Sequence, residues 1–110
     1  MAKKPSLNIV VPVYNEEREL SACITTLRRF AGEHLPDFDW IITVADNAST
    51  DRTLSIGREL ARKDRAVRVI HLDEKGRGRA VKFAWESIPA DYVAYMDVDL
   101  STDLKHLPAL

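Results

Sequence analysis

Short apolar runs alternate with segments of helical periodicity along this chain. Four of these runs are predicted strands, and the first, 7–13, is rich in β-branched residues and too apolar for a half-exposed strand, which is typical of a buried parallel strand. They are "LNIVVPV" (7–13), "DWIITVA" (39–45), "AVRVIHL" (66–72) and "DYVAYM" (91–96). The pattern therefore predicts four strands of a parallel sheet.

The gap after the first run predicts a helix with one apolar face. Asn15 is expected to cap this helix, with Glu16 and Glu17 in its first turn, where the helix dipole favours anions. The apolar face consists of Leu20, Ile24, Leu27 and Ala31.

The second and third gaps predict helices as well. In the second, Ser49, Thr50 and Asp51 are candidate caps. The face that follows them holds Leu54, Gly57, Leu60 and Ala61. A helix from about Arg77 to Ile88, ended by Pro89, is expected to bury Val81, Ala84, Trp85 and Ile88.

The order β-α-β-α-β-α-β is typical of an α/β fold, a Rossmann-like parallel sheet with helices on both faces. With the usual strand order 3-2-1-4, ligands bind beyond the carboxyl ends of the first and fourth strands. Residues 12–16 and 96–100 would form the walls of that crevice. The polar residues that gather at these strand ends are Asn15, Glu16, Asp46, Asn47, Asp97 and Asp99.

Composition narrows the class of protein. A length of 110 residues fits one small domain or part of a larger one. Sixteen Lys and Arg against seventeen Asp and Glu give no reason to expect a nucleic-acid partner. The single cysteine, Cys23, cannot form an internal disulfide and is interpreted as an apolar filler on a helix. With no signal core and no run near the ~20 residues of a membrane span, a cytoplasmic location is expected, at the cytoplasmic membrane face if further sequence carries an anchor.

Asp97-Val98-Asp99 is the first candidate for chemistry. In extended chain the two carboxylates point to the same side, with alpha carbons about 6.6 Å apart. They repel each other unless a cation lies between them, and Mg²⁺ or Mn²⁺ takes oxygen ligands and bridges to phosphates. The alternative is an ordinary strand end followed by a turn with helix caps.

Two further groups of polar residues have a functional and a structural interpretation. Asp46 and Asn47 either belong to a capping loop or, because three other caps follow them, contact the edge of a nucleobase. Lys75, Arg77 and Arg79 surround two glycines at a helix start, where they either contact phosphate or are simply solvated. His34, His71 and His106 have no metal-ligand spacing and are interpreted as surface or structural residues.

Four segments together resemble the family 2 inverting glycosyltransferases, which use nucleotide-diphosphate sugars. They are "VVPVYNE" (10–16), "ADNASTD" (45–51), "GRGRA" (76–80) and "MDVDLSTD" (96–103), in the family's order and spacing. The likeness covers nearly all of the chain but only the nucleotide-binding first half of the family's domain. The fourth segment is most similar to the branch that transfers sugars to polyprenyl phosphates, the dolichol-phosphate mannosyltransferase type.

The resemblance implies the A-type glycosyltransferase fold and a set of nucleotide-binding residues: Pro12, Tyr14, Glu16, Asp46, Asn47, Asp97 and Asp99. Asp46 would recognise the base, and Asp97 and Asp99 would handle ribose, diphosphate and metal, with Asp99 as the direct ligand. Lys75, Arg77 and Arg79 remain candidate diphosphate contacts.

The implied activity is metal-dependent, inverting transfer of a hexose from a GDP- or UDP-linked sugar to a polyprenyl phosphate. Residues 1–110 would be the donor-binding part, truncated after the DxD motif, with the catalytic residues in the second half; the chain alone would then be inactive. Three departures from the family pattern are Asn47, Ala48 and Ser101. The first two leave the base open between guanine and uracil, and Ala48 is strained if its φ is positive.

Two other functions are considered. "DVDLST" imitates the nucleophile motif of haloacid-dehalogenase-like phosphohydrolases, although that motif belongs on a domain's opening strand. A non-catalytic α/β nucleotide-binding or regulatory module is the alternative from a different class. Because the chain ends as another helix begins, we also expect uncovered apolar surface that favours self-association.

Overall fold

Four strands and three helices alternate along the chain, as the apolar pattern predicts. The structure, a computed structural model, describes residues 3–73 and 77–97, and of residues 77, 78, 80 and 81 only the backbone. The elements are β1 (Ser6–Val13), α1 (Leu20–His34), β2 (Asp39–Asn47), α2 (Thr53–Lys63), β3 (Val67–Leu72), α3 (Arg77–Ser87) and β4 (Tyr92–Tyr95).

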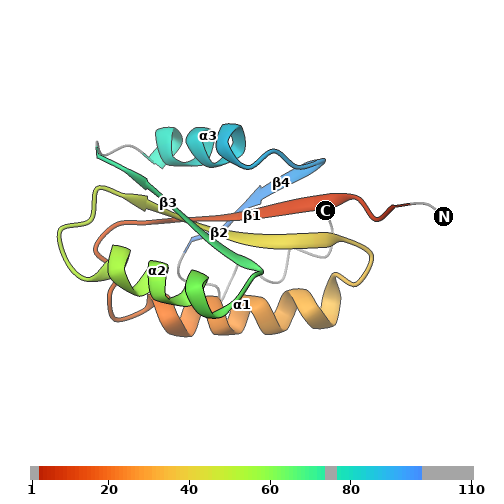
Figure 1. Cartoon of the computed structure of the whole chain (residues 1–110), viewed down its shortest axis with the longest axis horizontal. Helices are drawn as coiled ribbons and strands as arrows, with labels where there is room; N and C mark the ends of the chain where they lie inside the picture. Colours follow the sequence, from red (N-terminus) through yellow and green to blue (C-terminus); the bar gives the residue numbers. More distant parts are fainter. Residues whose placement is uncertain (1–2, 74–76, 98–110) are drawn as a thin grey trace.

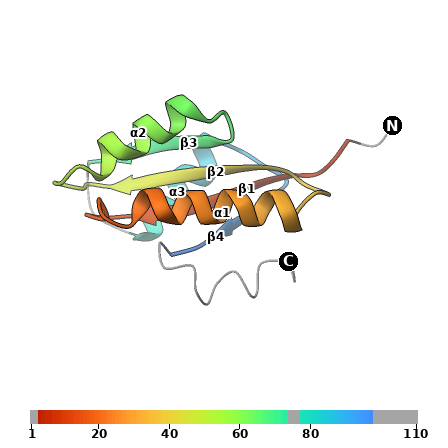
Figure 2. The same ribbon diagram turned by 90° about the horizontal axis from the view of Figure 1, so that it is seen from below.

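The sheet is parallel throughout and has the order β3-β2-β1-β4, which confirms the predicted topology. Figure 1 shows α3 on one face of the sheet and α1 and α2 on the other. Figure 2 shows α1 and α2 side by side on the face of the sheet that they both cover. Because both faces are covered, β1 is buried continuously from Leu7 to Val11, without the alternation of a half-exposed strand.

The larger part of the core lies between the sheet and the α1–α2 layer. It includes the predicted face of α1, with Leu20, Ile24, Leu27 and Ala31 all buried. Gly57 lets α2 approach the sheet closely, since a Cβ atom there would lie 3.2 Å from Val69 Cγ2. A smaller cluster, Val10, Ala45 and Ala84, packs beneath α3.

A buried polar pair ties the end of α3 to the sheet. Thr43 Oγ1 donates to Asn8 Oδ1 at 2.6 Å, and Asn8 Nδ2 donates to the carbonyl of Ile88 at 3.1 Å. Asn8 and Thr43 are fully buried. Their side chains therefore satisfy each other and a helix-end carbonyl, as buried polar groups must.

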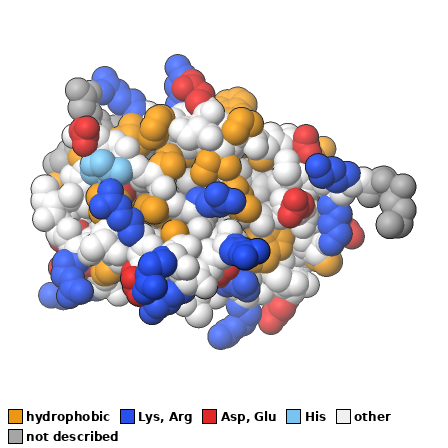
Figure 3. All heavy atoms as spheres, viewed as in Figure 1, with side chains coloured by type: hydrophobic (Ala, Val, Ile, Leu, Met, Phe, Trp, Pro, Cys, Tyr) orange, Lys and Arg blue, Asp and Glu red, His pale blue; other side chains and the backbone are white. Residues whose placement is uncertain are grey.

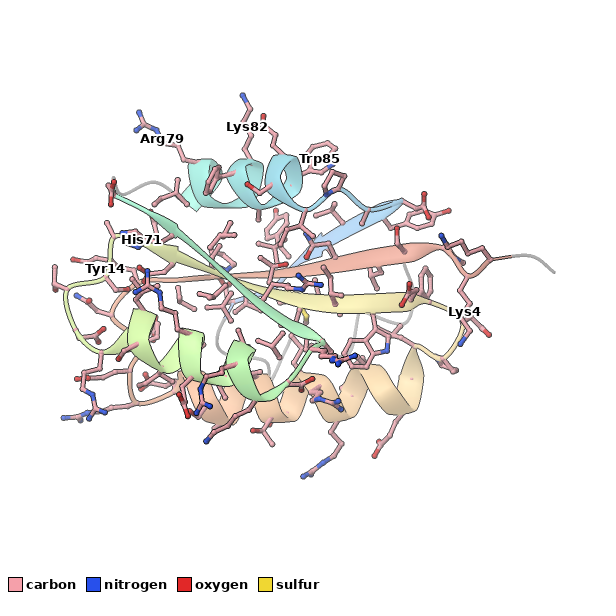
Figure 4. The ribbon with its side chains drawn as sticks, viewed as in Figure 1. Lys4, Tyr14, His71, Arg79, Lys82 and Trp85 are labelled. Atoms are coloured by element: carbon pink, nitrogen blue, oxygen red, sulfur yellow. The ribbon has the colours of Figure 1, made fainter. Side chains whose placement is uncertain are left out.

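Two local predictions are wrong. Helix α1 begins at Leu20 with no acidic residue in its first turn and no side-chain cap, because Asn15 is used elsewhere. Trp85 is 58% exposed, because Ala84 is the residue that faces the sheet and its neighbour turns outward. In Figure 4 Lys82 and Trp85 point away from the sheet.

Candidate functional site

The carboxyl ends of the strands bring residues from distant parts of the chain to one edge of the sheet. On β1, Val10 pairs with Tyr95 of β4, and Met96 N donates to the Val10 carbonyl at 2.9 Å. Asp97 follows Tyr95 by two residues, just as Pro12 follows Val10 by two residues on β1. Since β1 and β4 are neighbours, the predicted crevice position lies between these two residues.

The loops after β1 and β2 are joined by hydrogen bonds. Asn15 Oδ1 accepts from the backbone N–H of Thr50 at 2.8 Å and of Asp51 at 3.3 Å, while Asn15 N donates to Ser49 Oγ at 2.9 Å. Asn15 has a φ of 51°, a left-handed conformation that asparagine tolerates better than most residues. The two loops therefore form one unit at the edge of the sheet.

Asp51, and not Asp46, contacts the start of α2. Asp51 Oδ1 accepts from Thr53 N at 2.8 Å and from the Thr53 hydroxyl. Thr53 Oγ1 in turn accepts from Glu16 N at 2.7 Å, so the start of α2 also anchors the loop after β1. The loop therefore contacts the start of α2 through Asp51, while Asp46 contacts His71 instead.

Asp46 is a fully buried carboxylate with one ionic partner among the described residues. Its Oδ2 lies 2.7 Å from Nδ1 of His71, its register partner on β3. His71 Nε2 lies 2.9 Å from Asp73 Oδ1 on the solvent side. Within residues 3–73 and 77–97, Asp46 Oδ1 is buried and has no hydrogen-bond partner, a state that costs about 1–3 kcal/mol.

His71 is the residue of this site that sequence reasoning missed. Figure 4 shows it, like Tyr14, at the end of the sheet where β1, β2 and β3 finish, and Figure 3, in the same orientation, shows a histidine on the surface there. Its position near the carboxyl end of a strand was an available signal, since that edge of a parallel sheet holds ligand sites. Its pairing with Asp46 depends on strand register, which the sequence does not reveal.

Glu16 is half-buried at the same edge. Burial, and next the carboxylate of Glu19, raise the pKa of Glu16. Pro12 is half-buried and Tyr14 is 36% exposed, so both are placed to form a wall of the site.

The remaining predicted site residues are described only in part. Asp97 is exposed, and Arg79 is exposed in the first turn of α3, where Figure 4 shows it pointing away from the sheet. Lys75 and Asp99 lie outside the described residues, and Arg77 is described by its backbone alone. In the described ranges, no group of three or more His, Cys, Asp or Glu could hold a metal, and no helix could span a membrane.

The fold and this edge of the sheet define the class of protein. The family model described as glycosyl transferase family 2 matches residues 8–110. The chain therefore belongs to this family, as its motifs predict. Membership decides against the phosphohydrolase alternative, whose motif would also have to lie on the first strand rather than after the fourth.

Three curated relatives illustrate the likeness. Glycosyltransferase AglD of Haloferax volcanii is 33% identical over 105 residues, which are 94% of this chain and 17% of the relative. The low-salt glycan biosynthesis hexosyltransferase Agl6 of the same organism is 38% identical over 96% of this chain and 24% of its own length. The dolichyl-phosphate beta-glucosyltransferase of Drosophila melanogaster is 30% identical over 87% of this chain and 31% of its own. The chain thus spans between about a sixth and a third of these proteins.

A solved structure has the same fold. The mannosyltransferase PcManGT from Pyrobaculum calidifontis, in complex with GDP-Man and Mn²⁺, superposes with a TM-score of 0.73 over 88% of this chain and 28% of that chain. The sequence identity is 23%, so the match concerns the fold. It confirms the predicted A-type glycosyltransferase architecture.

Proposed function

We propose that this chain is the donor-binding part of an inverting glycosyltransferase that transfers a hexose from a GDP- or UDP-linked sugar to a polyprenyl phosphate. The observation that carries the proposal is the gathering of Pro12, Asp46 and Asp97 at the carboxyl edge of β1, β2 and β4 in a member of family 2. This is the position where open α/β sheets bind nucleotides.

The roles follow from burial and charge. Pro12, Tyr14 and the half-buried Glu16 line the nucleotide pocket. Asp46, with one carboxylate oxygen unpartnered among the described residues, accepts a hydrogen bond from the base. Asn47, the last residue of β2, lies beside it.

A divalent cation, Mg²⁺ or Mn²⁺, fits the oxygen donors at the end of β4. Magnesium in particular is held by one or two carboxylates together with substrate phosphates, rather than by a cage of protein ligands. Asp97 and Asp99 would supply those carboxylates, and PcManGT, the protein of similar fold, was solved with Mn²⁺. When bound, the cation offsets the charge that develops on the leaving diphosphate.

The proposed acceptor is a lipid phosphate. Its support is the name of the Drosophila melanogaster relative, a dolichyl-phosphate glucosyltransferase, together with the likeness of "MDVDLSTD" to that branch. A phosphate acceptor is already anionic, so it needs a general base less than a hydroxyl does. We place the acceptor-binding and catalytic residues outside this chain, and the reaction at the cytoplasmic face of a membrane.

Nucleotide titration tests the proposal. UDP and GDP, each with and without Mn²⁺, are titrated into the protein by calorimetry, and one of them is expected to bind in a Mn²⁺-dependent manner. Asp99→Ala should abolish the Mn²⁺ dependence, while Lys63→Ala, an exposed position on α2, should leave binding unchanged. Absence of binding by both nucleotides would contradict the proposal.

A non-catalytic nucleotide-binding module is the second candidate. It is favoured by Ala48, whose φ of 60° is strained for a residue other than glycine, as expected where a binding loop has degenerated. Turnover of the nucleotide sugar separates the two functions. A non-catalytic module would bind the nucleotide sugar but would neither hydrolyse it nor transfer its sugar, even in a protein as long as the relatives.

A further inference from the structure

Two carboxylates flank the imidazole of His71, one buried and one exposed. Nδ1 lies 2.7 Å from Oδ2 of Asp46, whose side chain is 0% exposed. Nε2 lies 2.9 Å from Oδ1 of Asp73, whose side chain is 94% exposed. Ionised carboxylates only accept, so each contact is a hydrogen bond when the nitrogen that faces it carries a proton.

The buried contact fixes the carboxylate of Asp46. His71 and Asp46 are register partners on neighbouring parallel strands, so their side chains leave the sheet on the same face. Because Nδ1 engages Oδ2, rotation of the carboxylate is blocked and the direction of Oδ1 is set. The second contact, of Nε2 with the exposed Asp73, lies on the solvent side of the ring and does not touch Asp46.

The other oxygen is an unused acceptor. Asp46 Oδ1 is buried and without a hydrogen-bond partner in the described part of the chain. A buried acceptor in this state costs free energy that an N–H donor of a ligand would recover. Uracil and guanine each present a ring N–H, which adenine and cytosine lack.

We infer that His71 is a positioning residue for base recognition: its Nδ1 holds Asp46 so that Oδ1 accepts the ring N–H of the nucleobase. The inference rests on the proposed function. His71 does not touch the base in this arrangement. Selectivity for the nucleobase depends on the Asp46–His71 pair. It does not need the contact with Asp73, because the Asp73 side chain is solvated.

Isosteric variants separate the two ring nitrogens. The amide nitrogen of asparagine stands where Nδ1 of histidine does, and that of glutamine stands where Nε2 does. His71→Asn therefore keeps the donor to Asp46, and His71→Gln keeps only the donor to Asp73. Asp73→Asn is the matched control for the exposed contact.

Affinities for UDP, GDP and inorganic pyrophosphate are measured by calorimetry in the presence of Mn²⁺. For the nucleotide that the unaltered protein binds, His71→Gln and His71→Ala are expected to weaken binding about tenfold, equivalent to about 1.4 kcal/mol. His71→Asn and Asp73→Asn should stay within about threefold. Pyrophosphate, which has no base, should bind all variants alike.

Three results would overturn the inference. If His71→Gln binds nucleotide as the unaltered protein does, Nδ1 does not position the acceptor. If His71→Asn binds the nucleotide no better than His71→Ala does, His71 only supports the fold. The same conclusion follows if the His71 variants lose pyrophosphate affinity in parallel with their melting temperature. Failure of the proposed function looks different, since the unaltered protein would then bind neither UDP nor GDP.

Discussion

Ala48 adopts a backbone conformation that its side chain disfavours. Its φ is 60°, directly after the last residue of β2. The left-handed region costs an L-residue about 1–2 kcal/mol, and glycine avoids this cost but loses more entropy on folding. We therefore expect Ala48→Gly to stabilise the protein by about 0.5–1 kcal/mol in urea unfolding.

The matched control for Ala48→Gly is Ala22→Gly, at an exposed position within α1. In a helix, glycine costs about 1 kcal/mol relative to alanine, so this variant should be less stable. A destabilised Ala48→Gly protein would show that the alanine methyl group makes a contact worth more than the strain.

Cys23 is predicted to be chemically inert in the native state. Its side chain is buried, and burial, followed by the charge of Glu16, raises the pKa of the thiol to about 12. At pH 8 the thiolate fraction then falls about a thousandfold below that of an ordinary cysteine. Labelling with a disulfide reagent should be slow in buffer and complete in concentrated guanidinium. Rapid stoichiometric labelling of the native protein would contradict the buried position.

At the scale of elements, the hydrogen bonds of Asn15 join two loops that are more than thirty residues apart in sequence. Asn15→Gly keeps the left-handed φ but removes the side-chain acceptor, and should cost about 1 kcal/mol. Asn15→Ala adds the strain of alanine at this φ, about 1 kcal/mol more. Chemical denaturation measures both. Equal stabilities for the two variants would mean that strain contributes nothing at this position.

The match between sequence and structure differs by element. Strands and the buried face of α1 were predictable, because continuous apolar runs and the spacing of Leu20, Ile24 and Leu27 are local signals. The role of Asn15 was not, since its partner Thr50 is brought near only by folding. The predicted burial of Trp85 was wrong because a residue at the border of an apolar helix face can point either to the sheet or to solvent. Of the site, the strand-end acids were predictable, and the link of Asp46 to the next strand was not.

At the scale of the molecule, β4 is an edge of the described sheet and carries exposed aromatic side chains. Tyr92 and Tyr95 are 58% and 60% exposed. Edge strands offer unpaired backbone groups to another chain, and exposed apolar surface strengthens such contacts. We expect concentration-dependent self-association in sedimentation velocity, reduced by Tyr92→Lys and Tyr95→Lys together. Strictly monomeric behaviour at high concentration would contradict this.

The stability of the whole molecule should depend on pH through one ion pair between the two helices of the larger layer. Arg28 on α1 donates to both carboxylate oxygens of Asp64, which follows α2. The hydrogen bond from Arg28 is the main reason that the pKa of Asp64 is lowered. The resulting stabilisation is complete above the usual carboxyl pKa of about 4 and is lost as the pH falls through the lower folded value.

Removing the carboxylate charge tests this pH dependence. Since the Arg28 side chain is 52% exposed, solvent screening limits the pair to about 0.5–1 kcal/mol. Asp64→Asn should lower stability at pH 7 by this amount and approach the unaltered protein below pH about 3. Arg28→Lys separates charge from geometry, because lysine retains the charge but not the planar group that lies over Trp40. A stability difference between Asp64→Asn and the unaltered protein that stays constant from pH about 7 to about 2 would show that packing, and not charge, joins the two helices.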